Sequence, residues 1–156
     1  MKNKISLLVM VPLLAACGSQ KPVANYYTHQ TECIGVELDG SQILRAWANT
    51  GQEADAIEQA KRNAIKEVLF GANYAGKPLC DNKPLLPLAN SLANNEGYFS
   101  KFFQGNGEYI KYAVLNEAGV EKDFRKNADA YIRAGFVIRV YRAALKQKMA
   151  DDGILK

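Results

Sequence analysis

The chain has 156 residues, of which 48% are hydrophobic and 23% charged, and its formal net charge at pH 7 is +4. A chain of this size suits one compact domain, because its core can bury about two-thirds of the surface that the unfolded chain exposes. The charge is too small to indicate binding to nucleic acid, which needs a strongly basic face. The composition therefore predicts a single globular domain without a nucleic-acid partner.

The first residues have the order of an export signal. Lys2 and Lys4 precede an apolar run from Ile5 to Leu14, and this run is far shorter than the roughly 20 residues of a membrane-spanning helix. It ends at Leu14-Ala15-Ala16-Cys17, which resembles the lipobox of bacterial lipoproteins. In that family the cysteine receives a diacylglycerol and becomes the first residue after cleavage. The alternative is a secreted protein whose signal peptide ends near a cysteine.

The lipobox resemblance implies a division of the chain. Residues 1–16 are then a cleaved signal peptide, residues 17–31 a lipidated cysteine with a flexible tether, and residues 32–156 a single domain. Acyl chains on Cys17 hold the protein to the membrane. Ser19 stands where an aspartate often decides sorting, which in lipoproteins implies the outer membrane. We therefore expect an outer-membrane anchor and a domain that faces the periplasm.

Cys33 and Cys80 are the cysteines that remain. In an oxidising compartment they can form a structural disulfide, and the alternative is two buried free thiols. The chain has one histidine, His29, which lies in the predicted tether. We therefore do not expect either cysteine to act as a catalytic nucleophile.

A hairpin is predicted at the start of the domain. Strands Cys33–Leu38 and Ser41–Ala48 flank Asp39-Gly40, the dipeptide typical of a two-residue turn. We expect Leu38 to pair with Ser41. The covered face of this hairpin would then consist of Ile34, Val36, Leu38 and Ile43, with Glu37 and Gln42 on the wet face.

Two helical regions follow. The first, Gln52–Phe70, opens with the capping box Thr50 and Glu53. Its predicted apolar face consists of Ala56, Ile57, Ala60, Ala64, Ile65, Val68 and Leu69. The second, Leu88–Phe103, carries an aromatic stripe of Phe99, Phe102 and Phe103. This stripe is either core or the lining of a cleft that binds an apolar ligand.

The last part of the chain is predicted as two strands and a helix. The strands are Glu108–Leu115 and Asp129–Tyr141, and the second places Ile132, Ala134, Phe136, Ile138 and Val140 on its covered face. The other face carries Val137 and a candidate partner surface of Arg133, Arg139 and Tyr141; the alternative is a solvated sheet face. The helix, Arg142–Asp152, ends at Gly153 with Ile154 placed to touch Met149, as in a Schellman cap.

This order of elements predicts an α+β fold: a single domain with a mostly antiparallel sheet of about four strands and two or three helices packed on one face. Two stretches carry a family resemblance, the Gly-bearing strand and Ala-spaced helix over residues 35–68 and the strand-to-helix run Ala134–Leu145. They resemble small bacterial envelope lipoproteins related to the amino-terminal domain of a flagellar assembly protein. The resemblance implies an accessory part of envelope machinery and transfers no site residues.

The expected function is non-enzymatic: a lipid-anchored interaction or assembly module of cell-envelope or secretion machinery, with an envelope protein as partner. We expect no cofactor and no metal, since the chain has no H-E-x-x-H, no G-x-S-x-G and no metal-spaced His or Cys cluster. The carboxylates of Glu37, Glu96 and Glu108 have no spacing that predicts a catalytic group. The alternatives are a hydrolase or thiol enzyme, and a carrier that holds an apolar ligand beside Phe99, Phe102 and Phe103.

Overall fold

A computed structural model describes residues 31–50, 53–71, 75–76, 80–81, 83–86, 92–116, 125–126 and 132–155. The predicted signal peptide, the lipidation site Cys17 and residues 18–30 of the predicted tether lie outside the described residues. Thr31, which the sequence placed at the end of the tether, is instead buried in the first strand, where it pairs with Ala46. The described domain therefore begins one residue earlier than expected.

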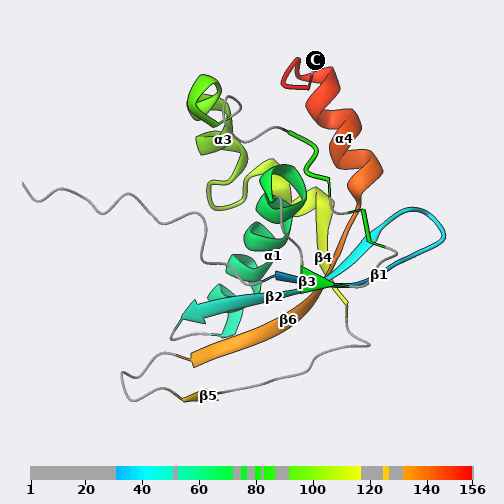
Figure 1. Cartoon of the computed structure of the whole chain (residues 1–156). Coiled ribbons are helices and arrows are strands. Elements are labelled where there is room, and N and C mark those ends of the chain that lie inside the picture. The colour runs from blue at the N-terminus through cyan, green and yellow to red at the C-terminus, as the bar shows by residue number, and fades with distance from the viewer. Residues whose placement is uncertain are drawn as a thin grey trace, which may run out of the picture.

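The sheet confirms the predicted α+β fold (Figure 1). Four antiparallel strands form its centre in the order β1 (Thr31–Val36), β2 (Gln42–Thr50), β6 (Ile132–Val140) and β4 (Ala113–Leu115). Two short strands extend it: β3 (Ala75–Gly76) runs parallel to β1, and β5 (Arg125–Lys126) pairs with β6. Strands β2 and β6, which are far apart in the sequence, pair along their whole length and form the middle of the sheet.

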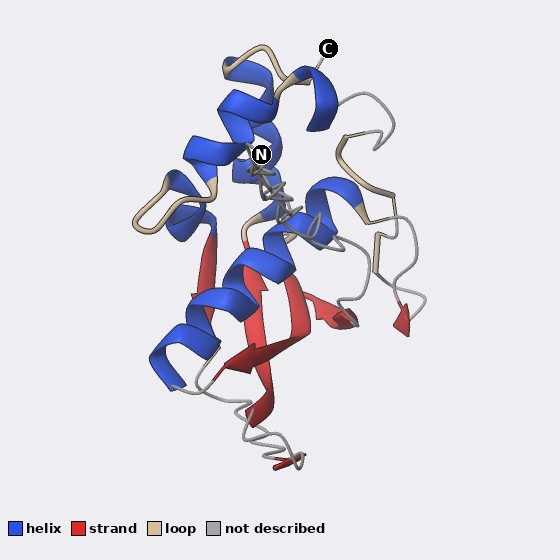
Figure 2. Ribbon diagram, turned by 90° about the vertical axis from the view of Figure 1, so that its left-hand side faces the viewer, coloured by secondary structure: helices blue, strands red, loops and turns tan. Residues whose placement is uncertain are grey.

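Helix α1 (Glu53–Phe70) covers one face of this sheet, which we call the inner face (Figure 2). The predicted apolar side chains of α1 are buried, except that Ile57 is only partly buried. Asn63 and Phe70 are buried as well, which the sequence did not predict. Ala56, Ala60 and Ala64 are almost fully buried. Because alanine has a single methyl group, this strip lets the helix axis approach β2 and β6 closely. On the predicted inner face of β6, Ala134, Phe136, Ile138 and Val140 are buried, whereas the side chain of Ile132 lies outside the described residues. Val137, predicted on the other face, is buried as well.

Helices α3 (Glu96–Phe102) and α4 (Arg142–Asp151) lie at the same end of the molecule in both views, and both contact the 3₁₀ helix η1 (Glu108–Tyr112) (Figure 1, Figure 2). The prediction of one helix over Leu88–Phe103 was wrong in extent. Residues 92–94 are helical, Asn95 forms a turn, and α3 starts after it; residues 88–91 lie outside the described residues.

The predicted strand Glu108–Leu115 was also wrong over its first five residues, which form η1. Tyr109 and Tyr112 explain the difference, because a 3₁₀ helix places residues three apart on the same side, whereas a strand would place them on opposite faces. Tyr109 contacts Phe103 at 6.0 Å between ring centroids, and Tyr112 stacks on Phe102 at 6.2 Å. Both tyrosines therefore pack against the end of α3.

The hairpin between β1 and β2 differs from the prediction in its register. The Glu37 N–H donates to Ser41 O at 2.9 Å and the Gly40 N–H to Glu37 O at 2.9 Å, so the loop is Leu38–Gly40 and Leu38 does not pair with Ser41. Of the loop residues only Gly40 has a positive φ, +80°. This is a three-residue turn closed by a left-handed glycine, not the two-residue turn that Asp-Gly suggested.

The new register exchanges the two faces of the hairpin, because side chains alternate along a strand. The predicted covered face was wrong: Leu38 is fully exposed and Val36 is 41% exposed. The buried side chains of β2 are Gln42, Leu44, Ala46 and Ala48. A bulge between Cys33 and Gly35 adds a further shift in β1. Both faces of β2 carry apolar residues, so the hydrophobic pattern did not discriminate between the registers.

The end of α4 confirms the predicted Schellman cap. Gly153 has φ +70°, the Ile154 N–H donates to Met149 O at 2.9 Å, and the Gly153 N–H donates to Ala150 O at 2.9 Å. Ile154 packs against the core cluster that contains the fully buried Met149. These two hydrogen bonds satisfy carbonyl groups that the end of a helix otherwise leaves unpaired.

Candidate functional site

One end of the sheet collects the exposed apolar side chains. We call it the hairpin end: it comprises the loop Glu37–Ser41 and the last two cross-strand rows of the sheet. These rows are Val36, Gln42, Val140 and Ala113, and next to it Gly35, Ile43, Arg139 and Val114. Among the described residues the exposed large hydrophobic side chains are Val36, Leu38 and Val114, and all three lie here. Exposed apolar residues that gather in one place indicate an interaction surface more strongly than scattered ones do.

The structure brings two of the three predicted surface residues together at this end. Arg139 lies on the outer face of the sheet, opposite α1, and donates to the Glu37 carboxylate from the hairpin loop. That hydrogen bond, and then one with Tyr141, raise the pKa of the Arg139 guanidinium. Arg139 is therefore a paired, half-exposed cation and not one that simply points into solvent. The Arg133 side chain lies outside the described residues, although its backbone belongs to β6.

A pocket of about 350 Å³ opens at the hairpin end next to Arg142 and Ala143, the first residues of α4. Its lining consists of Val36, Gly40, Gln42, Asp81, Arg142, Ala143 and Lys146. Asp81 links two other residues of this lining by hydrogen bonds. Its backbone carbonyl accepts from Gln42 Nε2 at 3.1 Å, and its carboxylate accepts from Arg142 Nη2 at 2.9 Å. The Lys83 N–H and then the Arg142 charge hold the pKa of the Asp81 carboxyl below its usual range. Asp81 is therefore an anion that fixes both Gln42 and Arg142.

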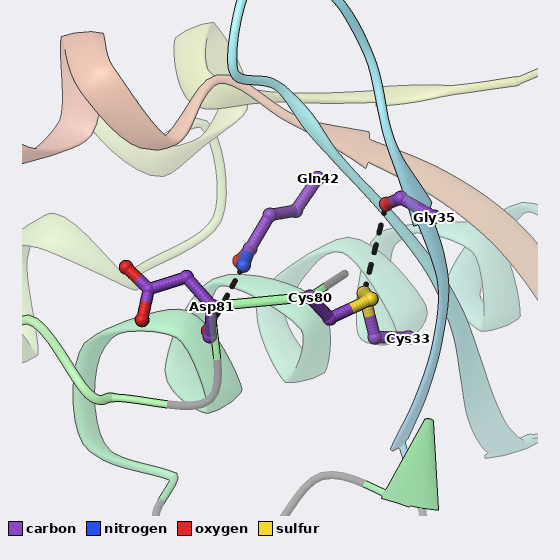
Figure 3. Close-up of a disulfide and its surroundings, with 5 residues drawn as sticks. All are labelled: Cys33, Gly35, Gln42, Cys80 and Asp81. Carbon is purple, nitrogen blue, oxygen red and sulfur yellow. Dashed lines mark hydrogen bonds between the residues drawn. A yellow bond between two sulfur atoms is a disulfide. The ribbon is translucent and has the colours of Figure 1, made fainter. Parts of the chain in front are cut away.

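The residue before Asp81 forms a disulfide. Cys33 on β1 and Cys80 are bonded, with their Cα atoms 6.3 Å apart (Figure 3). Of the two alternatives that the sequence left open, the structure therefore has the bridge. Cys33 Sγ also lies 3.6 Å from Gly35 O, a contact rather than a hydrogen bond because a disulfide sulfur carries no hydrogen. The bridge fixes the chain at Cys80 and so places Asp81 beside β2.

A second, polar cleft of about 520 Å³ lies between α3 and α4, and in it Lys148 pairs with both Glu108 and Asp152. Lys148 Nζ is 2.9 Å from the Glu108 carboxylate and 3.0 Å from that of Asp152, and Tyr98 donates its hydroxyl to Asp152 at 2.5 Å. The hydrogen bond to Glu108 raises the pKa of Lys148, and the one from Tyr98 lowers the pKa of Asp152. These contacts tie α3, η1 and α4 to one another.

The aromatic stripe on α3 forms part of the core. Phe99 and Phe102 are buried and Phe103 is partly buried. Ring centroids are 5.0 Å apart for Phe70 and Phe99 and 5.0 Å apart for Phe102 and Phe103. Of the three predicted ligand-lining residues only Phe102 borders the polar cleft. Their rings therefore pack against one another rather than around a common space.

A hydrogen-bond network that the sequence did not indicate joins α1 to η1. The Tyr109 hydroxyl donates to Glu58 Oε2 at 2.9 Å and accepts from Arg62 Nε at 3.0 Å, and the Arg62 guanidinium lies 5.3 Å from the Tyr109 ring centroid. Tyr109 is fully buried. The network satisfies a buried hydroxyl, so its role is structural.

The three carboxylates weighed from the sequence do not meet. Glu37 pairs with Arg139, Glu108 pairs with Lys148, and Glu96 is exposed. Within the described part of the chain, no three His, Cys, Asp or Glu side chains gather as metal ligands would. None of the described helices combines the length and the hydropathy that crossing a membrane requires.

Comparison with protein-family models, with curated proteins and with solved structures returned no match to this chain. The pocket residues Gln42, Asp81 and Arg142 were missed from the sequence. Gln42 was assigned to the wet face because the hairpin register was wrong, and Asp81 follows a cysteine whose partner the sequence left open.

Proposed function

We propose that this chain is a lipoprotein, anchored through Cys17 in the outer membrane, whose periplasm-facing domain docks a partner protein of cell-envelope or secretion machinery at the hairpin end. The lipobox Leu14-Ala15-Ala16-Cys17 supports the anchor, and the resemblance to small envelope lipoproteins supports the accessory role. The disulfide between Cys33 and Cys80 fits an oxidising compartment such as the periplasm. Residues 18–30 then serve as the tether between lipid and domain.

The gathering of exposed apolar side chains at the hairpin end carries this proposal. Leu38 stands at the tip of the hairpin with its whole side chain exposed, Val36 is exposed on β1 next to the loop, and Val114 is exposed at the same end of the sheet on β4. Burying one such leucine in a partner is worth about 2 kcal/mol. Asp81 neutralises only one of the two cations in the pocket, Arg142 and Lys146, so the lining of the pocket has a net charge of +1. The partner that fits offers an apolar recess for Leu38 and a negatively charged group nearby.

A site-specific photo-crosslink in intact cells tests the proposal. A photoreactive amino acid at position 38 of the full chain should capture a defined set of envelope proteins, identified by mass spectrometry after affinity purification. Ser100 is the matched control position, since it is also exposed but lies on α3. Capture should vanish when Cys17→Ala removes the anchor. The same proteins captured from positions 38 and 100, or none from either, would rule out docking at the hairpin end.

The variant Leu38→Asp provides the complementary test. Because the Leu38 side chain contacts solvent only, the substitution should change the free energy of unfolding by less than about 0.5 kcal/mol. It should nevertheless abolish co-purification of the partner, since a carboxylate does not enter an apolar recess. Undiminished co-purification with Leu38→Asp would show that the hairpin tip does not bind the partner.

A further inference from the structure

Two polar atoms in the pocket of the hairpin end lack a hydrogen-bond partner among the described residues: Gln42 Oε1 and Arg142 Nη1. Gln42 is 1% exposed, so its amide has left water almost completely. The orientation of this amide is set by Asp81, because a backbone carbonyl only accepts and must therefore face the Gln42 NH₂ group. The pocket thus offers one unused acceptor and one unused donor. A buried polar atom without a partner destabilises the folded chain, and a ligand that supplies the partner recovers that loss.

The first turn of α4 adds positive potential at the same place. Arg142 and Ala143 are its first residues and both line the pocket, no side chain caps this end of α4, and its first turn has no acidic residue. The uncapped N–H groups and the helix dipole favour an anion here. Lys146, one turn further along α4, lines the pocket as well. Donors, dipole and charge from α4 therefore line the same pocket as the Gln42 acceptor.

We propose that this pocket binds the carboxyl terminus of a partner polypeptide. The terminal carboxylate accepts from Arg142 Nη1 and the first turn of α4, with Lys146 beside it, and the last amide N–H donates to Gln42 Oε1. A chain end offers both groups at the closest spacing, because an acidic side chain places at least one additional carbon between the carboxylate and the amide N–H of its residue. The volume of about 350 Å³ lies at the small end of the range for ligand pockets, which suits the last one or two residues of a chain.

This inference rests on the proposed docking function and names the chemistry of the partner. The single negative charge of a chain end matches the net charge of +1 in the pocket. Asp81 is the positioning residue, since it holds Gln42 and Arg142 in place through its carbonyl and its carboxylate. The exposed Val36 at the rim offers an apolar contact for the side chain of the last residue.

Calorimetric titration of the full chain in detergent tests the inference with four probes. These are acetyl-Gly-Ala with a free carboxylate, its carboxyl amide, free alanine and acetate. We expect the free-acid peptide to bind, the amide to bind at least about tenfold more weakly because it lacks the charge, and alanine and acetate to bind more weakly than the peptide. Equal affinity for the acid and the amide, equal or tighter binding of alanine, or no binding of any probe would each overturn the inference.

Three variants locate the binding. Lys146→Gln, which changes an exposed side chain, should weaken the peptide roughly fivefold, and Gln42→Met should weaken it at least about tenfold. Lys101→Gln, which removes an exposed cation outside this pocket, should change nothing. Melting temperatures without peptide check that each variant is folded. If Gln42→Met unfolds, the comparison of peptide affinity between Lys146→Gln and Lys101→Gln still tests the site. Equal affinities of these two variants for the peptide would refute it.

The crosslink at position 38 separates this inference from the docking proposal. If the unmodified chain binds no peptide while the Lys146→Gln variant still captures the partner, the chain-end pocket is refuted. Docking at the hairpin tip is then still supported. Peptide binding that persists in Leu38→Asp while co-purification of the partner is lost supports both, because it assigns separate contacts to the tip and to the pocket.

Discussion

Reduction of the disulfide between Cys33 and Cys80 is expected to cost this domain a large part of its stability. The two cysteines are 47 residues apart, and the closed loop contains β1 from Cys33 onward, all of β2 and α1, and β3. A cross-link of this span lowers the entropy of the unfolded chain by an amount worth about 4 kcal/mol at 25 °C. Domains of this size are typically stable by about 5–15 kcal/mol, so the bridge supplies a substantial share.

Urea unfolding of the same chain with and without reductant measures this directly, because the side chains are identical in both arms. We expect the oxidised chain to be more stable by about 4 kcal/mol. The Cys33→Ala, Cys80→Ala double variant should behave like the reduced chain and should not respond to reductant. A difference below about 1 kcal/mol between the oxidised and reduced chains would refute the loop-entropy reasoning and indicate an unfolded state that stays compact without the bridge.

Three further measurements test other parts of the structure. Burial raises the pKa of Glu67 to about 7, above the value of 4.5 for the free side chain, so ionisation of Glu67 costs stability progressively as pH rises from 4.5 to 7. Glu67→Gln should therefore leave the melting temperature unchanged at pH 4 and stabilise the protein by roughly 1 kcal/mol at pH 8, where this half-buried carboxyl group is ionised. An equal gain at both pH values would contradict this. A Cβ added at Gly97 would touch nothing, so Gly97→Ala should stabilise α3 by about 0.5 kcal/mol. A Cβ added at Gly135 would lie 3.1 Å from the ring of Trp47, the single tryptophan, so of these two variants only Gly135→Ala should shift the tryptophan fluorescence. Thermal melts with phospholipids and fatty acids should show no rise, since the rings on α3 pack against one another; a rise that follows ligand concentration would restore the apolar carrier.

The sequence predicted the helices best where several signals agreed. In α1 the alanine spacing and the alternation of apolar and charged residues pointed to the same buried face, which the structure has. In α4 the glycine and the isoleucine that follows predicted the Schellman cap. Sequence analysis failed where one signal stood alone. Asp39-Gly40 is compatible with two turn lengths, and a difference of one residue in the loop reverses which side chains are buried.

The candidate site was less predictable because tertiary contacts create it. Arg139 and Tyr141 were expected on one surface, but nothing local indicates that Glu37 reaches Arg139 from 102 residues away. The pocket depends on Gln42, Asp81 and Arg142, which come from three separate segments. The disulfide places Asp81 beside β2, and the pairing of β2 with β6 sets Gln42 opposite Val140, shortly before Arg142. A polar residue such as Gln42 at the start of a strand is ordinarily assigned to solvent, so its burial is visible only in the folded chain.

The position of the disulfide also determines how the domain responds to mechanical tension. Cys33 is the third residue of the described domain, so a pull on the preceding segment can peel Thr31 and Glu32 from β2 before it reaches the bridge. From there the covalent path crosses directly to Cys80, and residues 34–79 carry no load. The central strand β2 and helix α1 therefore stay outside the stretched path for as long as the bridge is intact. Breaking it would release about 160 Å of additional contour length over the 47-residue span.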